Sequence, residues 1–167
     1  MEIRQAVPEN AEKLIEYLKL VGGETDNLTF GSEGMPLSVE AEKRFIQSYL
    51  DDGRSAMLLA WDGDDIVGCG SLMCMNRRMS HRAGIAISVK KSEWGKGIGS
   101  ILMDNMIAQA LKAGIEIISL EVRVDNKRAI HLYEKYGFRN IGTFPAFFKI
   151  GDEYVDFELM TLDLRGM

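Results

Sequence analysis

Cysteine, histidine and net positive charge are all scarce in this chain of 167 residues. Twenty Lys and Arg side chains stand against 25 Asp and Glu, which gives a formal net charge of −5 at pH 7. Nucleic-acid binding needs a basic surface that neutralises phosphates, so we do not expect nucleic acid as a partner. The chain also lacks an N-terminal apolar signal and any apolar run of about 18 residues. We therefore expect a soluble, cytoplasmic protein that has no membrane partner.

The only two cysteines, Cys69 and Cys74, lie five positions apart in an apolar stretch and form no CxxC or Cys/His pattern. Within a strand, an odd offset places two side chains on opposite faces. We expect two buried thiols in a reducing compartment rather than a redox or metal site. The two histidines, His81 and His131, also lack ligand spacing, so no metal is expected.

The composition is that of an ordinary globular protein, with 46% hydrophobic and 27% charged residues. A chain of this length buries a sizeable core without disulfides or a metal. It contains no repeat, low-complexity tract or linker. We therefore predict a single domain that spans residues 1–167.

Hydrophobic periodicity predicts the element order β-α-α-β-β-β-α-β-α-β-β. The first helix is expected to end at Gly22-Gly23, and the second to begin at Ser38. This order indicates an α/β (α+β) domain with a mixed sheet. Strands are predicted at 3–6, 55–61, 66–75, 82–89, 115–124, 139–150 and 154–164, and helices at 11–21, 38–50, 98–113 and 126–136.

The stretch "KSEWGKGIGS" at 91–100 joins a predicted strand to a predicted helix and contains glycine at three alternate positions, 95, 97 and 99. A strand, a glycine-rich turn and a helix direct free backbone N–H groups at an anion. A Walker A loop would need Ser or Thr after its lysine, but Lys96 is followed by Gly97. A dinucleotide fingerprint would need GxGxxG early in a βαβ unit. A turn without a ligand and a different phosphate cradle remain as alternatives.

Two segments resemble the Gcn5-related N-acetyltransferase (GNAT) family: "SVKKSEWGKGIGSILM" and "LEVRVDNKRAIHLYEKYGFRNIG". The family signature Q/R-x-x-G-x-G/A falls on Trp94 to Gly99, and Trp94 stands where Arg or Gln is usual. The resemblance is concentrated in residues 85–142. The second family pattern, V-x-x-x-N-x-x-A-x-x-L-Y-x-K-x-G-F, matches at Val122, Asn126, Ala129, Leu132, Tyr133, Lys135, Gly137 and Phe138.

The resemblance implies the GNAT fold, a central mixed and mostly antiparallel sheet of about seven strands with about four flanking helices. It implies acetyl-CoA as the acetyl donor and direct attack by a primary amine in a ternary complex, without a metal. The backbone of Ile87 and Val89 would hold the pantetheine, and the Val89 N–H would stabilise the oxyanion. Asn126 and Ala129 would line the CoA arm. The pyrophosphate loop would consist of Trp94, Gly95, Lys96, Gly97, Ile98, Gly99 and Ser100.

The resemblance also implies that Tyr133 contacts the CoA and acts as general acid toward the departing thiolate, although its position on an apolar helix face is also typical of a core aromatic. The general base is less well defined. Glu121 is a candidate, and pairing with Arg123 on the same strand face is the alternative. The acidic segment 21–42 would suit a cationic acceptor or be a solvated loop.

The acceptor stays open among small amines, polyamines, amino acids, antibiotics and protein N-termini. The final hairpin carries Phe144, Phe147, Phe148 and Phe157. Core packing is the expected use of most of these rings, with an acceptor wall or a homodimer surface as alternatives. A non-catalytic acyl-CoA sensor or interaction module is the rival function. The retention of Tyr133 beside the glycine loop favours the enzyme.

Overall fold

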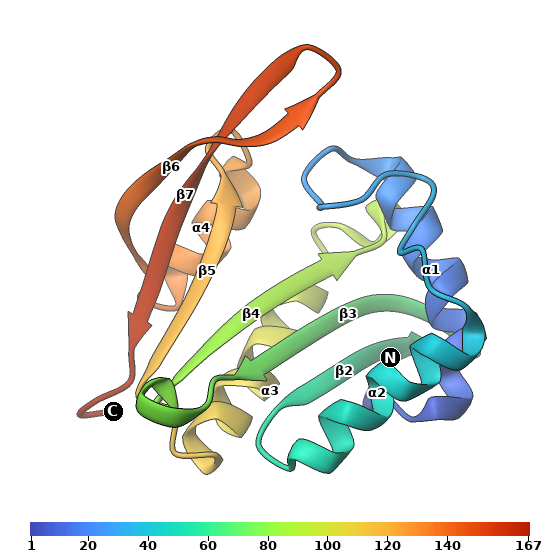
Figure 1. Ribbon diagram of the computed structural model, residues 1–167, viewed down its shortest axis with the longest axis horizontal. Coiled ribbons are helices and arrows are strands. Elements are labelled where there is room, and N and C mark those ends of the chain that lie inside the picture. Colours follow the sequence, from blue (N-terminus) through green and yellow to red (C-terminus); the bar gives the residue numbers. More distant parts are fainter.

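The computed structural model describes residues 1–167, and its elements follow the predicted order. One-turn 3-10 helices at Pro8–Asn10, Arg77–Met79 and Lys91–Glu93 supplement the main elements. The elements, shown in Figure 1, are β1 (Glu2–Gln5), α1 (Ala11–Glu24), α2 (Val39–Asp52), β2 (Ala56–Asp62), β3 (Asp65–Cys74), β4 (Arg82–Val89), α3 (Ile98–Lys112), β5 (Ile117–Arg123), α4 (Lys127–Lys135), β6 (Arg139–Ile150) and β7 (Glu153–Asp163).

The seven strands form one sheet in the order β1-β2-β3-β4-β5-β7-β6, and only the β4–β5 pair is parallel. This confirms the mixed, mostly antiparallel sheet. The β4–β5 ladder is short: it runs from the Arg82–Ile117 pair to the Gly84–Ser119 pair and then stops. Beyond that point the two strands diverge (Figure 1). The facing edges of β4 and β5 therefore have no strand partner over their second halves.

Two layers of helices cover opposite faces of this sheet (Figure 1). Helices α1 and α2 pack on β1 to β3 through an apolar cluster that includes Leu14, Ile46 and Leu59. Helices α3 and α4 pack on the other face through the larger cluster around Leu102 and Ile118. Cys69 and Cys74 are both free and lie on opposite faces, as their odd spacing predicts.

Helix α3 lies close to β3 because β3 carries glycine at the contact. A Cβ atom at Gly68 would come within 2.9 Å of Ile98 Cγ2. Gly68 is paired across the sheet with Val89, the last residue of β4. The first residue of α3 is therefore held next to the end of β4, well beyond the point where β4 and β5 separate.

The predicted end of the first helix at Gly22-Gly23 is wrong, because α1 continues through both glycines to Glu24. A Cβ atom at Gly22 would lie 2.1 Å from the backbone oxygen of Gly31. The glycine here permits close contact between α1 and the loop that follows it. It does not terminate the helix.

Core packing is the wrong prediction for two of the four phenylalanines in the final hairpin. The exposed fractions of Phe144 and Phe147 are 40% and 42%, whereas Phe157 is buried. The rings of Phe144 and Phe147 stack with centroids 5.2 Å apart. They lie on β6, the outer strand of the sheet, which has only β7 as a neighbour. An edge strand with one unpaired side buries fewer side chains than its alternation suggests.

The inward stripe of α2 contains a carboxyl group, Glu42, whose exposed fraction is 1%. Its Oε2 atom is fully buried and has no hydrogen-bond partner. Desolvation raises the pKa of Glu42 above its ordinary value. The folded state thus holds the Glu42 proton more tightly than the unfolded state does.

We predict that the E42Q variant removes a pH-dependent cost of folding. In the parent, the free energy of unfolding should fall as pH rises from the ordinary Glu pKa through the raised folded value, by about 1.4 kcal/mol per unit of pKa difference. E42Q should lack this decline, so its stability relative to the parent should improve between pH 5 and pH 8 in urea titrations. The exposed neighbour E40Q is the control. Equal pH dependence of parent and E42Q would contradict the prediction.

Candidate active site

The second half of β4 presents backbone groups to the side on which β5 has separated. The Lys90 N–H donates to the Val67 carbonyl across the β3 side, at 3.0 Å. Backbone groups alternate direction along a strand, so the N–H and C=O of Ile87 and Val89 point toward β5. Because the β4–β5 ladder ends at Gly84, no strand bonds to them there.

The side chains of β4 also alternate. Ser88 faces α1, where its Oγ and the Tyr17 hydroxyl are 2.9 Å apart. Ile87 and Val89 pack against the cluster beneath α3. Helix α1 thus braces β4 from one face while α3 supports it from the other. The unpaired edge is held in place without a partner strand.

The glycine loop follows directly and uses its glycines in two ways. Gly95 and Gly97 have φ values of +79° and +84°, and nothing lies within 4 Å of a Cβ built at either position. A side chain in this left-handed conformation costs about 1–2 kcal/mol. Gly99 instead permits helix contact, since a Cβ there would lie 3.1 Å from Leu132 Cδ2 of α4. Gly97 is the N-cap of α3, so the loop delivers the free N–H groups of that helix to the open side.

Trp94 joins the glycine loop to both β4 and α4. Its indole N–H donates to the Val89 carbonyl at 2.9 Å. The Arg128 guanidinium lies over its ring, 4.0 Å from the centroid. Trp94 therefore fixes the end of β4 and supports a cation from the first turn of α4.

Arg128 was not identified by the sequence reasoning. The Arg128 side chain is exposed beside the glycine loop, and it makes no ion pair and no hydrogen bond within the protein. By contrast, Lys96 pairs with Glu93 at 3.0 Å, and the Lys127 ammonium donates to the Val124 carbonyl. The only sequence signal was its position inside the second family segment, because the stacking on Trp94 is a tertiary contact.

Helix α4 is fixed at its start by Asn126, whose Oδ1 accepts the Ala129 N–H at 3.3 Å. This cap places the first turn of α4 beside the glycine loop. At the other end of α4, the C-cap residue Tyr136 donates its hydroxyl to Asp104 Oδ1 at 2.7 Å. The two contacts tie α4 to its own N-cap and to α3.

Tyr133 has a different environment from Tyr136. Its exposed fraction is 8%, its ring is 5.7 Å from that of Phe138, and burial raises its pKa to about 12. Its hydroxyl has no hydrogen-bond partner in the protein. The only fully enclosed side-chain polar atoms without a partner are those of Glu42 and Trp61, so the Tyr133 oxygen retains contact with open space. Tyr133 is both a core aromatic and a free donor.

The predicted alternative of a Glu121–Arg123 pair is wrong. Arg123 binds Asp125 instead, with Nε 2.6 Å from Oδ1, and its Nη1 donates to the Asp26 carbonyl at 3.3 Å. The hydrogen bond from Arg123 lowers the pKa of Asp125. Glu121 is exposed and forms no ion pair. A free carboxylate thus lies on the strand that faces the open edge of β4.

The acidic segment between α1 and α2 is partly used to build its own loop. Glu24 Oε2 accepts the Lys91 N–H at 2.8 Å, which ties α1 to the start of the glycine stretch. Glu33 accepts the Gly31 N–H at 2.9 Å, and this bond lowers the pKa of Glu33. Glu24 thus joins α1 to the glycine stretch, while Glu33 stabilises a turn within the loop itself.

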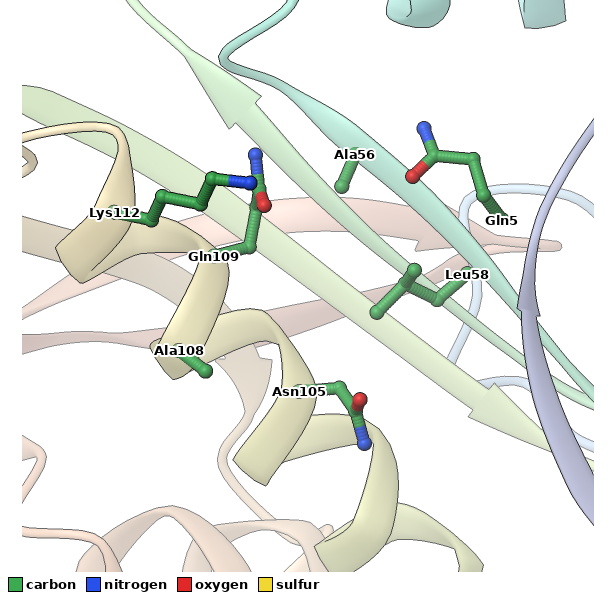
Figure 2. Close-up of a pocket in the computed structure, with 7 residues that line it drawn as sticks. All are labelled: Gln5, Ala56, Leu58, Asn105, Ala108, Gln109 and Lys112. Atoms are coloured by element: carbon green, nitrogen blue, oxygen red, sulfur yellow. The ribbon is translucent and has the colours of Figure 1, made fainter.

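The pocket shown in Figure 2 lies away from these residues. It has a volume of about 260 Å³ and is formed by β1, β2 and α3. None of the residues discussed above lines it, so we do not assign it to the site. Its lining residues are Gln5, Ala56, Leu58, Asn105, Ala108, Gln109 and Lys112.

No group of three or more His, Cys, Asp or Glu side chains is arranged to hold a metal ion. None of the helices combines the length and the apolarity that a membrane crossing requires.

The chain is similar in sequence and in structure to known acetyltransferases. The chain is 37% identical to the L-amino acid N-acetyltransferase AaaT of Escherichia coli (strain K12) over 101 residues. These residues cover 59% of this chain and 62% of the relative, so the match spans less than two thirds of the relative's length. A crystal structure of a GNAT-family acetyltransferase from Streptococcus pneumoniae matches with a TM-score of 0.93 and 28% identity over 97% of this chain and 98% of the other. The yncA protein of Salmonella typhimurium, solved with its cofactor acetyl-CoA, shares the fold with a TM-score of 0.85 at 17% identity, over 99% and 95% of the two chains.

The family model described as "Acetyltransferase (GNAT) family" matches residues 24–138. That range contains the diverging strands β4 and β5, the glycine loop and all of α4. The match covers well over half of the chain. The chain belongs to the acetyltransferase (GNAT) family.

Proposed function

We propose that this protein is an acetyl-CoA-dependent N-acetyltransferase that acts on the primary amine of an acceptor by direct attack in a ternary complex. The observation that carries the proposal is the unpaired edge of β4 directly before a glycine loop whose backbone N–H groups are free. This edge and loop suit an extended pantetheine arm that ends in a pyrophosphate.

The donor would be held mainly by backbone groups. Ile87 and Val89 would bond the pantetheine as an added strand does, and the Val89 N–H would stabilise the developing oxyanion. The loop residues Trp94 to Ser100 would surround the pyrophosphate at the positive end of the α3 dipole. Asn126 and Ala129 would contribute by fixing the first turn of α4 at the CoA arm, since the Asn126 oxygen already caps that turn.

An amine attacks only after it has lost its proton, so the reaction needs a base. We assign this role to Glu121, whose carboxylate is free and lies on the strand that faces the open edge of β4. The nitrogen–carbon bond forms, the carbon–sulfur bond breaks, and the thiolate leaves with its charge near the Tyr133 hydroxyl. With a pKa of about 12, Tyr133 is protonated at every working pH. Full proton transfer to a thiolate of ordinary pKa would cost about 5 kcal/mol, so we propose that Tyr133 acts mainly by donating a strong hydrogen bond to the leaving sulfur.

A covalent acyl-enzyme has no support in this chain. Burial raises the pKa of the Cys69 thiol to about 12 and also raises that of Cys74. Both sulfurs therefore stay protonated and are poor nucleophiles. A non-catalytic CoA sensor remains the rival function. The free Tyr133 hydroxyl favours the enzyme, because binding alone does not require a proton donor of this kind.

We predict that Tyr133→Phe lowers kcat by about 10²-fold, at the low end of the range for a general acid, with little change in CoA affinity. The fold should be preserved because the lost hydroxyl makes no hydrogen bond within the protein. Amine-dependent release of free thiol from acetyl-CoA is the measurement. Tyr136→Phe serves as the matched control: it should lose stability through the Asp104 bond and keep its turnover.

A Tyr133→Phe enzyme with parental turnover would contradict this role. Tight CoA binding by the parent without thiol release from any amine would favour the sensor.

We predict that Arg128, stacked on the Trp94 ring, binds a phosphate group of CoA. A stacked guanidinium that has no protein acceptor keeps its N–H groups for an anion. Arg128→Gln should raise the Kd for CoA by about 10-fold and leave the Kd for pantetheine, which has no phosphate, unchanged. Trp94→Ala should have a similar effect, and Trp94→Phe a smaller one, in calorimetric titrations.

Lys135→Gln is the control for Arg128, because Lys135 also lies over an aromatic ring, 5.8 Å from the centroid of Tyr136, at the far end of α4. Its CoA affinity should match that of the parent. Equal losses of CoA and pantetheine binding in Arg128→Gln would show that the pair only packs the loop.

A further inference from the structure

One face of the sheet is covered by helices on one side of β4 and left uncovered on the other. Helices α1 and α2 lie over β1 to β3 on this face, whereas no helix lies over β5, β7 and β6 (Figure 1). On β5, Ile118 and Leu120 point into the core beneath α3 and α4. Ser119 and Glu121 alternate with them and therefore point to the uncovered face.

Arg82 lies on the same face, at the position where β4 and β5 are still paired. Its Nη2 donates to Ser119 Oγ at 2.8 Å, which is the one hydrogen bond of the Arg82 side chain. It takes part in none of the ion pairs. The side chain is half-buried. A guanidinium carries five N–H donors, so most of those of Arg82 have no acceptor.

An unpaired, half-buried guanidinium is costly, and the cost is offset when an anion binds it. The chain has five more acidic than basic residues, yet none of its carboxylates reaches Arg82. The Ser119 hydroxyl holds the guanidinium in one orientation. Arg82 is thus a fixed cation that is suited to an anion from outside the chain.

Glu121 supplies the complementary charge. It lies two residues beyond Ser119 on β5, which is about 6.6 Å along the strand, and it is exposed and free of ion pairs. The arrangement runs from the cation at the closed end of the strand pair to the carboxylate where the strands have separated. A zwitterion that carries its carboxylate and its ammonium on one carbon matches this order of charges.

We propose that the acceptor is an α-amino acid or a close analogue, with its carboxylate bound by Arg82 and its amino group beside Glu121. The proposal rests on the proposed acetyltransferase function and names the acceptor class for it. Glu121 takes a proton from the ammonium group, the amine nitrogen bonds to the acetyl carbon, and the thiolate departs. The products are an N-acetyl amino acid and CoA.

Charge also separates this class from the other amines. A polyamine would bring a second cation toward Arg82, and like charges at such a site are unfavourable. An internal peptide unit or an amino acid amide lacks the carboxylate and would leave the guanidinium unpaired. The uncovered face is open to solvent, so a small acceptor can reach both side chains without a change of fold.

The test compares three acceptors with one side chain: an L-amino acid, its carboxamide and its decarboxylated amine, taken across several side chains. For the best side chain, kcat/KM of the parent should be highest for the free acid. Arg82→Gln should lower kcat/KM for the acid by about 10- to 100-fold and change it little for the amide. Arg82→Lys should recover part of the loss, since it restores the charge but not the planar fork.

Two matched variants separate recognition from folding. Arg139→Gln changes another arginine of this face, on β6, and should leave the preference for the acid intact. Ser119→Ala removes only the hydroxyl that orients Arg82 and should give an intermediate loss. CoA affinity, measured alongside, should equal that of the parent in all variants.

Equal use of acid and amide by the parent would overturn the proposal while leaving the acetyltransferase function standing. So would an Arg82→Gln variant that loses acid and amide activity in equal measure. Acetylation of none of these acceptors would also overturn the proposal. The proposed function itself fails only if the parent binds CoA and releases no thiol with any other class of amine, such as polyamines or peptide N-termini.

Discussion

The site depends on one feature of the sheet: the β4–β5 ladder stops at the Gly84–Ser119 pair. Parallel strands in a continuous sheet would satisfy their backbone groups along the full length. Here the second half of β4 keeps its shape because α1 and α3 brace it from either face, and its free edge remains available. A cofactor arm can then complete the sheet where a strand is missing. The open edge has a structural cost, and a bound ligand would recover it.

The glycine loop continues directly from this edge, and the one cationic side chain within the motif, Lys96, is paired with Glu93. Gly95 and Gly97 turn the chain so that α3 begins beside the end of β4. The family's usual Arg or Gln is replaced by Trp94, which fixes the Val89 carbonyl through its indole N–H. A guanidinium is then provided from α4 by Arg128. The residue that departs from the motif is thus also the one on which a cation from α4 stacks.

Much of the fold could be predicted from the sequence because the periodicities were strong and the turns carried clear signals. The strand 82–89 agrees with the expectation, and α4 begins and ends within one residue of the predicted 126–136. Local rules failed where tertiary packing decided the outcome. Gly22 continues a helix because a neighbouring loop contacts it, and Phe144 is exposed because β6 lies at the edge of the sheet.

The candidate site was predicted in its motif-bearing parts and not in its long-range pairs. The two family segments located the glycine loop and α4. Stacking of Arg128 on Trp94 and the bond between Arg82 and Ser119 join residues far apart in the sequence, so no spacing rule could find them. Likewise, Arg123 forms its ion pair with Asp125 and not with Glu121, and strand alternation alone does not determine which of the two it binds. Glu121 is therefore left as a free carboxylate on the strand that faces the open edge of β4.

The central claim is that the unpaired edge of β4 receives the CoA arm, and amide hydrogen exchange tests it most directly. Ile87 and Val89 direct their N–H groups to the open side, whereas Ser88 and Lys90 direct theirs to β3, where Lys90 bonds Val67. We predict that CoA slows amide exchange at Ile87 and Val89, and that amide exchange at Ser88 and Lys90 is slow with or without CoA. Unchanged exchange at Ile87 and Val89 in the presence of saturating CoA would contradict the account.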